Sequence, residues 1–222
     1  MSTNLKLYID FISQPCRSLY IILKQSGVPF DKVLIDLAKG EQLTSEYKKI
    51  NRFQKVPCIT DGDFKLAESG AILRYLASTK RLSESLYSNN IQERAHIDEF
   101  LEWHYTLRKE IMNFFYLDWL GPLRSGQPTP AEELANGRRD MEKVFDILEK
   151  TWLNSSKYVT GSKITAADIF GVSELQQTTL SKYDVGRNYP KIAEWIENVR
   201  QETNPHFDDA HKILYKIAKI SK

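Results

Sequence analysis

Residues 56–76, VPCITDGDFKLAESGAILRYL, combine three elements of secondary structure in one continuous segment. Residues 56–60 and 64–67 each predict a short strand, and the Asp61-Gly62-Asp63 turn between them is typical of a β-hairpin. After Glu68, apolar side chains recur at helical spacing, at Ile72, Leu73 and Leu76. The segment therefore predicts an antiparallel strand pair that leads directly into a helix.

The residues before this segment predict two strands that alternate with two helices. Apolar residues alternate over residues 5–9, which predicts a strand, and Pro15 suits the first turn of a helix that ends near Gly27. Residues 33–37 predict a second strand, and residues 44–50 predict a short helix with a threonine cap. The predicted order of this first part is β-α-β-α-β-β-α.

The rest of the chain shows only helical periodicity. We expect an α+β protein with a first domain over residues 1–79, a polar linker over 80–90 and an all-helical domain over 91–222. Thr165 and Asp168 have the spacing of a helix capping box, which indicates a structural role. Helices are predicted over residues 91–117, 131–153, 165–180, 190–200 and 206–220, with a loop over 121–130.

Composition excludes several classes of function. Lys and Arg number 31 against 29 Asp and Glu, a balance that argues against a dedicated nucleic-acid binder. The two cysteines, Cys16 and Cys58, cannot form a disulfide framework or a four-thiolate zinc site, and the four histidines show no metal-ligand spacing. The longest apolar run, residues 19–23, is far too short to span a bilayer, and the first residues do not resemble a signal peptide. We expect a cytoplasmic protein with no bound metal and no membrane or nucleic-acid partner.

Four motifs then carry a resemblance to a known family. They are, in chain order, Leu7-Tyr8-Ile9-Asp10 with Ser13-Gln14-Pro15-Cys16-Arg17, then Lys55-Val56-Pro57, then Glu68-Ser69-Gly70-Ala71-Ile72, and then Gly161 to Asp168. Together they resemble the cytosolic glutathione transferases, and the Ser-Gln-Pro-Cys-Arg context resembles the theta class. The resemblance implies a thioredoxin-like domain that holds glutathione and a helical domain that shapes the site for the second substrate.

Ser13 is the candidate catalytic residue. It lies at the start of a predicted helix, where unpaired N–H groups and the helix dipole stabilise an anion. The resemblance implies that its hydroxyl group stabilises the glutathione thiolate, while the alternative is that Ser13 only caps the helix. Tyr8 is the second candidate donor, because other classes of the family use a tyrosine near the end of the first strand. Cys16 is expected to be a small buried residue rather than a reactive thiol.

The resemblance also implies a set of residues that bind glutathione. Pro57 is expected to be cis, which would turn the Val56 peptide group toward the cysteinyl backbone of the ligand. Ser69 and Glu68 are expected to bind the carboxylate and the ammonium group of the γ-glutamyl end, although Ser69 is also a natural helix cap. Gln42 and Lys55 match positions near the glycine end, although a solvated surface lysine is an ordinary alternative. The full expected set is Gln42, Lys55, Val56, Pro57, Glu68 and Ser69.

The acceptor substrate is expected to contact the helical domain. Aromatic residues cluster over residues 105–119, and we assign Arg108, Tyr116 and Trp119 to the acceptor site, although such a cluster also suits a hydrophobic core. Residues 206–220 form an amphipathic helix that is either solvated on one face or placed over the site.

The resemblance implies a homodimeric enzyme with glutathione as co-substrate. It would conjugate the thiolate to hydrophobic electrophiles such as organic halides, epoxides or peroxides. One alternative is a non-catalytic binding or assembly module of the same fold. Another is a glutathione-dependent reductase, which is disfavoured because Ser13 stands where the attacking cysteine of such enzymes would lie.

Overall fold

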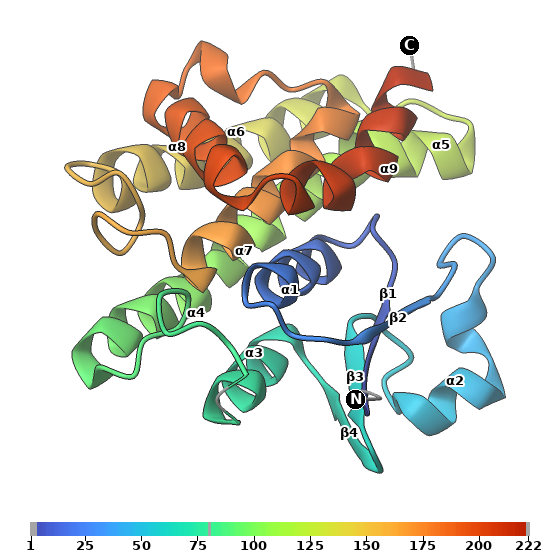
Figure 1. The fold of residues 1–222 in the computed structure, drawn as a ribbon. Helices are drawn as coiled ribbons and strands as arrows, with labels where there is room; N and C mark the ends of the chain where they lie inside the picture. The colour runs from blue at the N-terminus through green and yellow to red at the C-terminus, as the bar shows by residue number, and fades with distance from the viewer. Residues whose placement is uncertain (1–3, 80, 221–222) are drawn as a thin grey trace.

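The computed structural model describes residues 4–79 and 81–220, and its first half is built on a four-stranded sheet (Figure 1). Three predicted domain bounds fall on residues outside those described. They are Met1 at the start of the first domain, Lys80 at the start of the linker and Lys222 at the end of the helical domain. The strand order is β2-β1-β3-β4, with β1 parallel to β2 and antiparallel to β3, and β3 antiparallel to β4. The strands are β1 (Leu5–Ile9), β2 (Asp31–Leu34), β3 (Cys58–Asp61) and β4 (Phe64–Ala67).

Helices cover both faces of this sheet because the side chains of β1 alternate. Leu5, Leu7 and Ile9 are buried with the apolar residues of α1 (Gln14–Gln25) and α3 (Ser69–Ser78). Tyr8 points to the opposite face and packs in a smaller cluster with Cys58 and with Tyr47 of α2 (Ser45–Ile50). The α+β class and the thioredoxin-like arrangement of the first domain are confirmed.

The described residues of the second half form helices joined by loops, with no strand of a sheet among them, and this half packs against α1. In Figure 1, α1 lies between the sheet and the helical layer, and it contacts both α7 and α9. The longer helices are α4 (Ile91–Phe115), α6 (Ala131–Ile147), α7 (Ala166–Leu175), α8 (Pro190–Thr203) and α9 (His206–Ile220). Shorter turns are η1 (Glu41–Leu43), η2 (Tyr116–Leu120), α5 (Gly121–Ser125), η3 (Leu148–Trp152), η4 (Gln176–Ser181) and η5 (Val185–Arg187).

The predicted capping box is present at the start of α7. The Asp168 side chain is fully buried, and its carboxylate accepts hydrogen bonds from the Thr165 N–H at 2.8 Å and the Thr165 hydroxyl group at 3.0 Å. It also accepts from the Val159 N–H at 2.9 Å and from Trp195 Nε1 of α8 at 2.8 Å. One carboxylate thus joins the start of α7, the preceding loop and α8.

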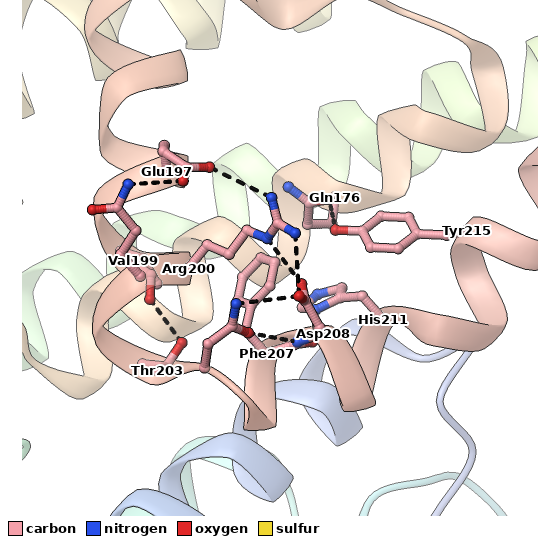
Figure 2. A network of polar contacts seen from close by, with 11 residues as sticks. Gln176, Glu197, Val199, Arg200, Thr203, Phe207, Asp208, His211 and Tyr215 are labelled. Atoms are coloured by element: carbon pink, nitrogen blue, oxygen red, sulfur yellow. Dashed lines mark hydrogen bonds and ion pairs between the residues drawn. The ribbon is translucent and has the colours of Figure 1, made fainter.

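Helix α9 is held in place by polar contacts to α8 and to η4 (Figure 2). Arg200 of α8 donates from Nε to Asp208 at 2.8 Å, and Tyr215 donates to the Gln176 side chain at 2.8 Å. Phe207, Ala210 and Leu214 of the helix are fully or almost fully buried. The helix is therefore amphipathic, as predicted, and it packs against η4.

Several predicted boundaries are wrong. The strand predicted over residues 33–37 is observed at Asp31–Leu34, because its partner β1 ends at Ile9. The strand predicted to begin at residue 56 begins at Cys58, since Pro57 has no N–H for a ladder. The predicted loop 121–130 begins with the helical turn α5. Gly121 permits this turn, because a Cβ there would lie 2.8 Å from the Tyr116 carbonyl oxygen.

Two helix ends also differ from prediction. Glu68, not Ser69, is the cap of α3, and Ser69 is its first helical residue. The helix predicted over 165–180 is α-helical only as far as Leu175 and continues as the 3₁₀ turn η4. No helix among the described residues is long and apolar enough to cross a membrane.

Candidate functional site

Four segments that carry predicted site residues meet at one end of the sheet. Tyr8 is opposite Cys58, and Cys58 is opposite Ala67, so the end of β1, the start of β3 and the end of β4 lie side by side. Ile9 is opposite Leu34, which brings the segment after β2 to the same end. Ser13, Val56-Pro57, Glu68-Ser69 and Gln42 are therefore all carried by loops or turns that leave this end of the sheet.

Ser13 is the residue immediately before α1, and hydrogen bonds fix its backbone. Its N–H donates to the Asp10 carbonyl oxygen at 3.0 Å, and its own carbonyl accepts from the Arg17 N–H at 3.2 Å. The Asp10 carboxylate accepts from the N–H groups of Ile12 at 2.9 Å and Leu37 at 3.1 Å, which ties this loop to the segment after β2. The Ser13 side chain makes no capping bond to the helix, and its hydroxyl group contacts the buried Cys16 thiol.

Ser13 lines a cleft of about 980 Å³ between the two halves of the chain. Its walls are mostly apolar: Phe11 and Ile12 come from the first half, and Met112, Phe115 and Trp119 come from α4 and η2. Phe115 and Trp119 stack with ring centroids 5.3 Å apart. The same cleft is lined by Leu120, Leu123, Arg124, Gln177, Ile213 and Ile217, among others.

Helix α9 forms part of this cleft rather than being only a solvated helix. Ile213 and Ile217 line the cleft, while Leu214 on the same helix is buried against Phe115 and Leu180. The predicted amphipathic face thus serves two surfaces, the helical core and the cleft. This feature favours the second of the two alternatives for residues 206–220, a helix placed over the site.

The loop before β3 has the geometry expected of a peptide-binding loop. The Val56–Pro57 bond is cis, and the Val56 peptide group lies outside the β3 ladder. The Lys55 carbonyl accepts from the Tyr47 hydroxyl group at 2.8 Å and from Asn51 at 2.6 Å, which anchors the loop to α2 and its cap. The Lys55 side chain is exposed.

Gln42 lies next to this loop in η1. Its carbonyl oxygen accepts from the side chain of Gln54 at 3.3 Å, so the two loops are joined. Its own side-chain oxygen, Oε1, is buried and has no hydrogen-bond partner among the described residues. A buried acceptor without a partner costs free energy, and a ligand N–H group would satisfy it.

Glu68 and Ser69 lie at the N-terminus of α3. Ser69 is buried, with 7% of its surface exposed, and Glu68 is exposed with a positive φ of 68°. That backbone conformation is unusual for a residue other than glycine and is often associated with functional sites. Neither residue is among those that line the large cleft.

The structure separates Tyr8 from the cleft. Its ring is 9% exposed and faces α2, with its centroid 6.2 Å from that of Tyr47. It is not among the residues that line the cleft beside Ser13.

Of the three predicted acceptor residues, only Trp119 lines the cleft. Tyr116 is 51% exposed and lies outside the lining, near Gly121. Arg108 also lies outside it, and its Nη1 donates to the buried Glu174 carboxylate at 3.2 Å.

Neither cysteine is suited to nucleophilic chemistry. Both are free thiols and both are buried. Burial raises the pKa of Cys16 to about 12, although a hydrogen bond with the Ser13 side chain acts in the opposite direction. Burial likewise raises the pKa of Cys58 to about 11. Because the thiolate is the reactive form, both side chains are inert at neutral pH, which agrees with the interpretation of Cys16 as a small buried residue.

Sequence patterns assigned no role to three residues around Ser13. Asp10 and Arg17 both form hydrogen bonds to its loop, and Gln177 lines the cleft and accepts a hydrogen bond from Arg17 at 3.1 Å. Arg17 and Gln177 are 160 residues apart, so no local pattern could reveal that contact. Within the described residues, no group of three or more His, Cys, Asp and Glu side chains could hold a metal ion.

Comparisons with known proteins agree with this arrangement. Residues 4–78 match the family model for the glutathione S-transferase N-terminal domain, and residues 110–202 match that for the C-terminal domain. Mouse glutathione S-transferase theta-3 is 36% identical over 215 residues, which cover 96% of this chain and 89% of the mouse protein. Glutathione S-transferase T1 of Arabidopsis thaliana is 39% identical over 222 residues, covering 96% and 90%.

Solved structures give the same result. Human glutathione S-transferase T1-1, in its apo form, superimposes with a TM-score of 0.92 at 33% identity, covering 97% of this chain and 91% of the human chain. Human glutathione transferase theta-2, solved in complex with glutathione, gives a TM-score of 0.90 at 32% identity, with 98% and 90% covered. Fold and sequence similarity agree, and the chain belongs to the theta class of the glutathione S-transferase family.

Proposed function

We propose that this glutathione transferase uses the Ser13 hydroxyl group to stabilise the thiolate of glutathione, which then attacks a hydrophobic electrophile bound in the large cleft. The observation that carries the proposal is the position of Ser13. It is the residue before α1, its side chain is not used as a helix cap, and it lines the same cleft as Phe115 and Trp119.

Ionisation of the thiol is the first chemical requirement. A free thiol has a pKa of about 8.5, so only a small fraction is thiolate at neutral pH. A hydrogen bond from Ser13 and the positive end of the α1 dipole both favour the charged form. Each unit by which the thiol pKa falls corresponds to about 1.4 kcal/mol of selective thiolate stabilisation.

The remaining ends of glutathione suit the loops around Ser13. The N-terminus of α3, with the Ser69 hydroxyl group, suits the γ-glutamyl carboxylate, and Glu68 suits the ammonium group. The Val56 peptide group would pair with the cysteinyl backbone beside the cis bond to Pro57. The buried Gln42 Oε1 would accept an N–H from the glycine end, and the exposed Lys55 would bind its carboxylate.

The second substrate would occupy the apolar part of the cleft. For an organic halide, the thiolate forms a carbon–sulfur bond while the carbon–halogen bond breaks and halide leaves with the electron pair. Holding both reactants in contact removes much of the entropic cost of this encounter. Trp119 is the predicted acceptor residue that the cleft geometry supports, and the acceptor roles of Arg108 and Tyr116 stay predictions.

The test is conjugation of glutathione to a chloronitrobenzene and to an epoxide by three variants. Ser13→Ala should lower kcat about tenfold or more, with a rise in the pKa of the bound thiol. Tyr8→Phe should leave turnover unchanged. Ser18→Ala is a matched control, because it removes another α1 hydroxyl group, which donates only to the Gln14 carbonyl. Unchanged turnover in Ser13→Ala would refute the proposed role, and a loss in Tyr8→Phe would favour the second candidate.

We further propose that the chain forms a homodimer in the cytoplasm and that its domains divide at the linker 80–90. Two reduced thiols, Cys16 and Cys58, are consistent with a reducing compartment. The family models end at residue 78 and resume at residue 110, on either side of the predicted linker. Light scattering would test the dimer, and a monomer at micromolar concentration would contradict it.

A further inference from the structure

Arg17 places a buried cation directly behind the Ser13 loop. The side chain belongs to the first turn of α1 and has no exposed surface. Its Nη1 donates to the carbonyl oxygens of Phe11 at 2.8 Å and Ile12 at 3.1 Å. These are the two residues that immediately precede Ser13 in the chain, so one guanidinium group controls the peptide planes that lead into it.

The direction of those two carbonyl groups matters for an anion at Ser13. Phe11, Ile12 and Ser13 all line the cleft. A carbonyl oxygen that turned toward the cleft would place the negative end of a peptide dipole near the thiolate. Arg17 holds both oxygens toward the core instead. Fixed dipoles of this kind act strongly in a site from which water is excluded.

The other half of the guanidinium group is anchored in the helical domain. Its Nη2 donates to the Ser173 carbonyl of α7 at 2.9 Å and to Gln177 Oε1 of η4 at 3.1 Å. The capping box around Asp168 fixes the start of the same helix α7. The Arg17 side chain therefore links the Ser13 loop directly to the helical domain.

Other charged and titratable groups surround Arg17. They are the buried Glu174, which pairs with Arg108, together with Cys16, His211 and Tyr215. Burial lowers the pKa of Arg17 to about 10, so the side chain is still a cation at neutral pH. The Glu174 carboxylate acts in the opposite direction and favours the charged guanidinium.

We infer that Arg17 is a positioning residue for the transferase reaction: by holding the Phe11 and Ile12 carbonyls against α7, it keeps the Ser13 hydroxyl group directed at the thiolate and keeps peptide oxygens away from it. The inference rests on the proposed role of Ser13. It assigns to Arg17 an effect on thiol ionisation and on kcat that a residue with only a structural role would not have.

The experiment compares Arg17→Lys and Arg17→Met with the wild type. Each purified protein is assayed for kcat, for KM of glutathione and for the pH dependence of kcat/KM, and the thiolate is followed directly by its ultraviolet absorbance in the bound complex. Arg17→Met should raise the pKa of the bound thiol by about one unit, which is about a tenfold loss of thiolate at neutral pH. KM should change much less than kcat, and turnover should recover at high pH. Arg17→Lys keeps the charge and should recover part of kcat.

Arg200→Met is the matched control. It removes another arginine that joins two helices, since Arg200 of α8 pairs with Asp208 of α9 on the side of α9 shown in Figure 2. In this variant, the pKa of the bound glutathione thiol and the pH dependence of kcat/KM should equal those of the wild type, even if its thermal stability is lower. A loss of stability in the Arg17 variants with an unmoved pH profile would overturn the inference and leave Arg17 as a structural residue.

Two further outcomes keep the inference testable. If neither Arg17 variant folds, Gln177→Leu is used, which removes one of the four acceptors of the guanidinium group. It should shift the thiol pKa in the same direction, and an unmoved pKa would overturn the inference.

If Ser13→Ala is as active as the wild type, the proposed function of Ser13 fails. If Ser13→Ala is impaired and the Arg17 variants keep a wild-type profile, only the present inference fails.

Discussion

Replacing Asp168 with asparagine should destabilise the protein strongly while leaving the chemistry of its folded form intact. The Asp168 carboxylate is fully buried and accepts four hydrogen bonds, two on each oxygen. Asparagine has nearly the same shape but only one acceptor oxygen. With this oxygen toward Val159 and Trp195, the amide NH₂ group would face the Thr165 N–H, and two donors would oppose each other.

The structure sets the size of the effect. A buried donor left without a partner costs about 1–3 kcal/mol, and a hydrogen bond to a neutral oxygen is about 1 kcal/mol weaker than one to a carboxylate. One stranded N–H and two weakened bonds sum to about 3 kcal/mol or more. For a chain of this length that is a fall in Tm of about 6–12 °C.

Denaturant unfolding of wild type and Asp168→Asn measures this difference. Asp208→Asn is the control, because this carboxylate is 44% exposed in its ion pair with Arg200 and should lose less than about 1 kcal/mol. The kcat of folded Asp168→Asn should equal that of the wild type, since Asp168 does not line the cleft. A destabilisation below 1 kcal/mol would show that the four bonds do not stabilise the helix start as argued.

Three other predictions concern packing, pH and thiol reactivity. Gly171→Ala would place a Cβ 2.6 Å from Trp195 Cη2 and 2.9 Å from Phe100 Cζ, so the free energy of unfolding should fall by about 1–3 kcal/mol; an unchanged denaturation midpoint would contradict this. Burial lowers the pKa of His104 to about 4, so between pH 6.5 and 4 only the unfolded chain takes up this proton and stability falls as the pH falls. Between pH 7 and pH 4.5, the free energy of unfolding should therefore fall less for His104→Gln than for the wild type. An equal fall in both proteins would show that His104 does not cause the loss of stability. Cys16 and Cys58, with pKa values raised to about 12 and 11, should resist alkylation at pH 8 until the chain unfolds, which mass spectrometry can follow; rapid labelling of the native protein would disprove their burial.

Local patterns predicted most of the elements because their signals lie within a few residues of each other. The alternation of Leu5, Leu7 and Ile9 is a property of one strand, and each of these residues is buried. The Asp61-Gly62-Asp63 turn joins β3 to β4 as predicted. The spacing of Thr165 and Asp168 predicted a capping box that the structure contains. The cis bond before Pro57, in contrast, was implied by the family resemblance alone.

Boundaries were less predictable because partners decide them. β2 ends where β1 offers no further pairing, and α5 forms where Gly121 allows close approach to the Tyr116 carbonyl. The acceptor residues show the same limit. Arg108 and Trp119 lie on one continuous run of helical turns, yet Trp119 lines the cleft and Arg108 pairs with Glu174 outside it. Which side of a long helix meets a neighbour depends on how distant helices pack.

The amino-acid sequence was therefore sufficient for the order of strands and helices and for the family, since each depends on short motifs or on similarity along the chain, and the same motifs made Ser13 the candidate catalytic residue. Folding in three dimensions settled which side chains share the cleft with Ser13. Phe115, Gln177 and Ile213 come from three separate helical turns, and Arg17 reaches across to α7 to hold the Ser13 loop. Contacts over such separations arise from the packing of whole helices, and no local periodicity contains that information.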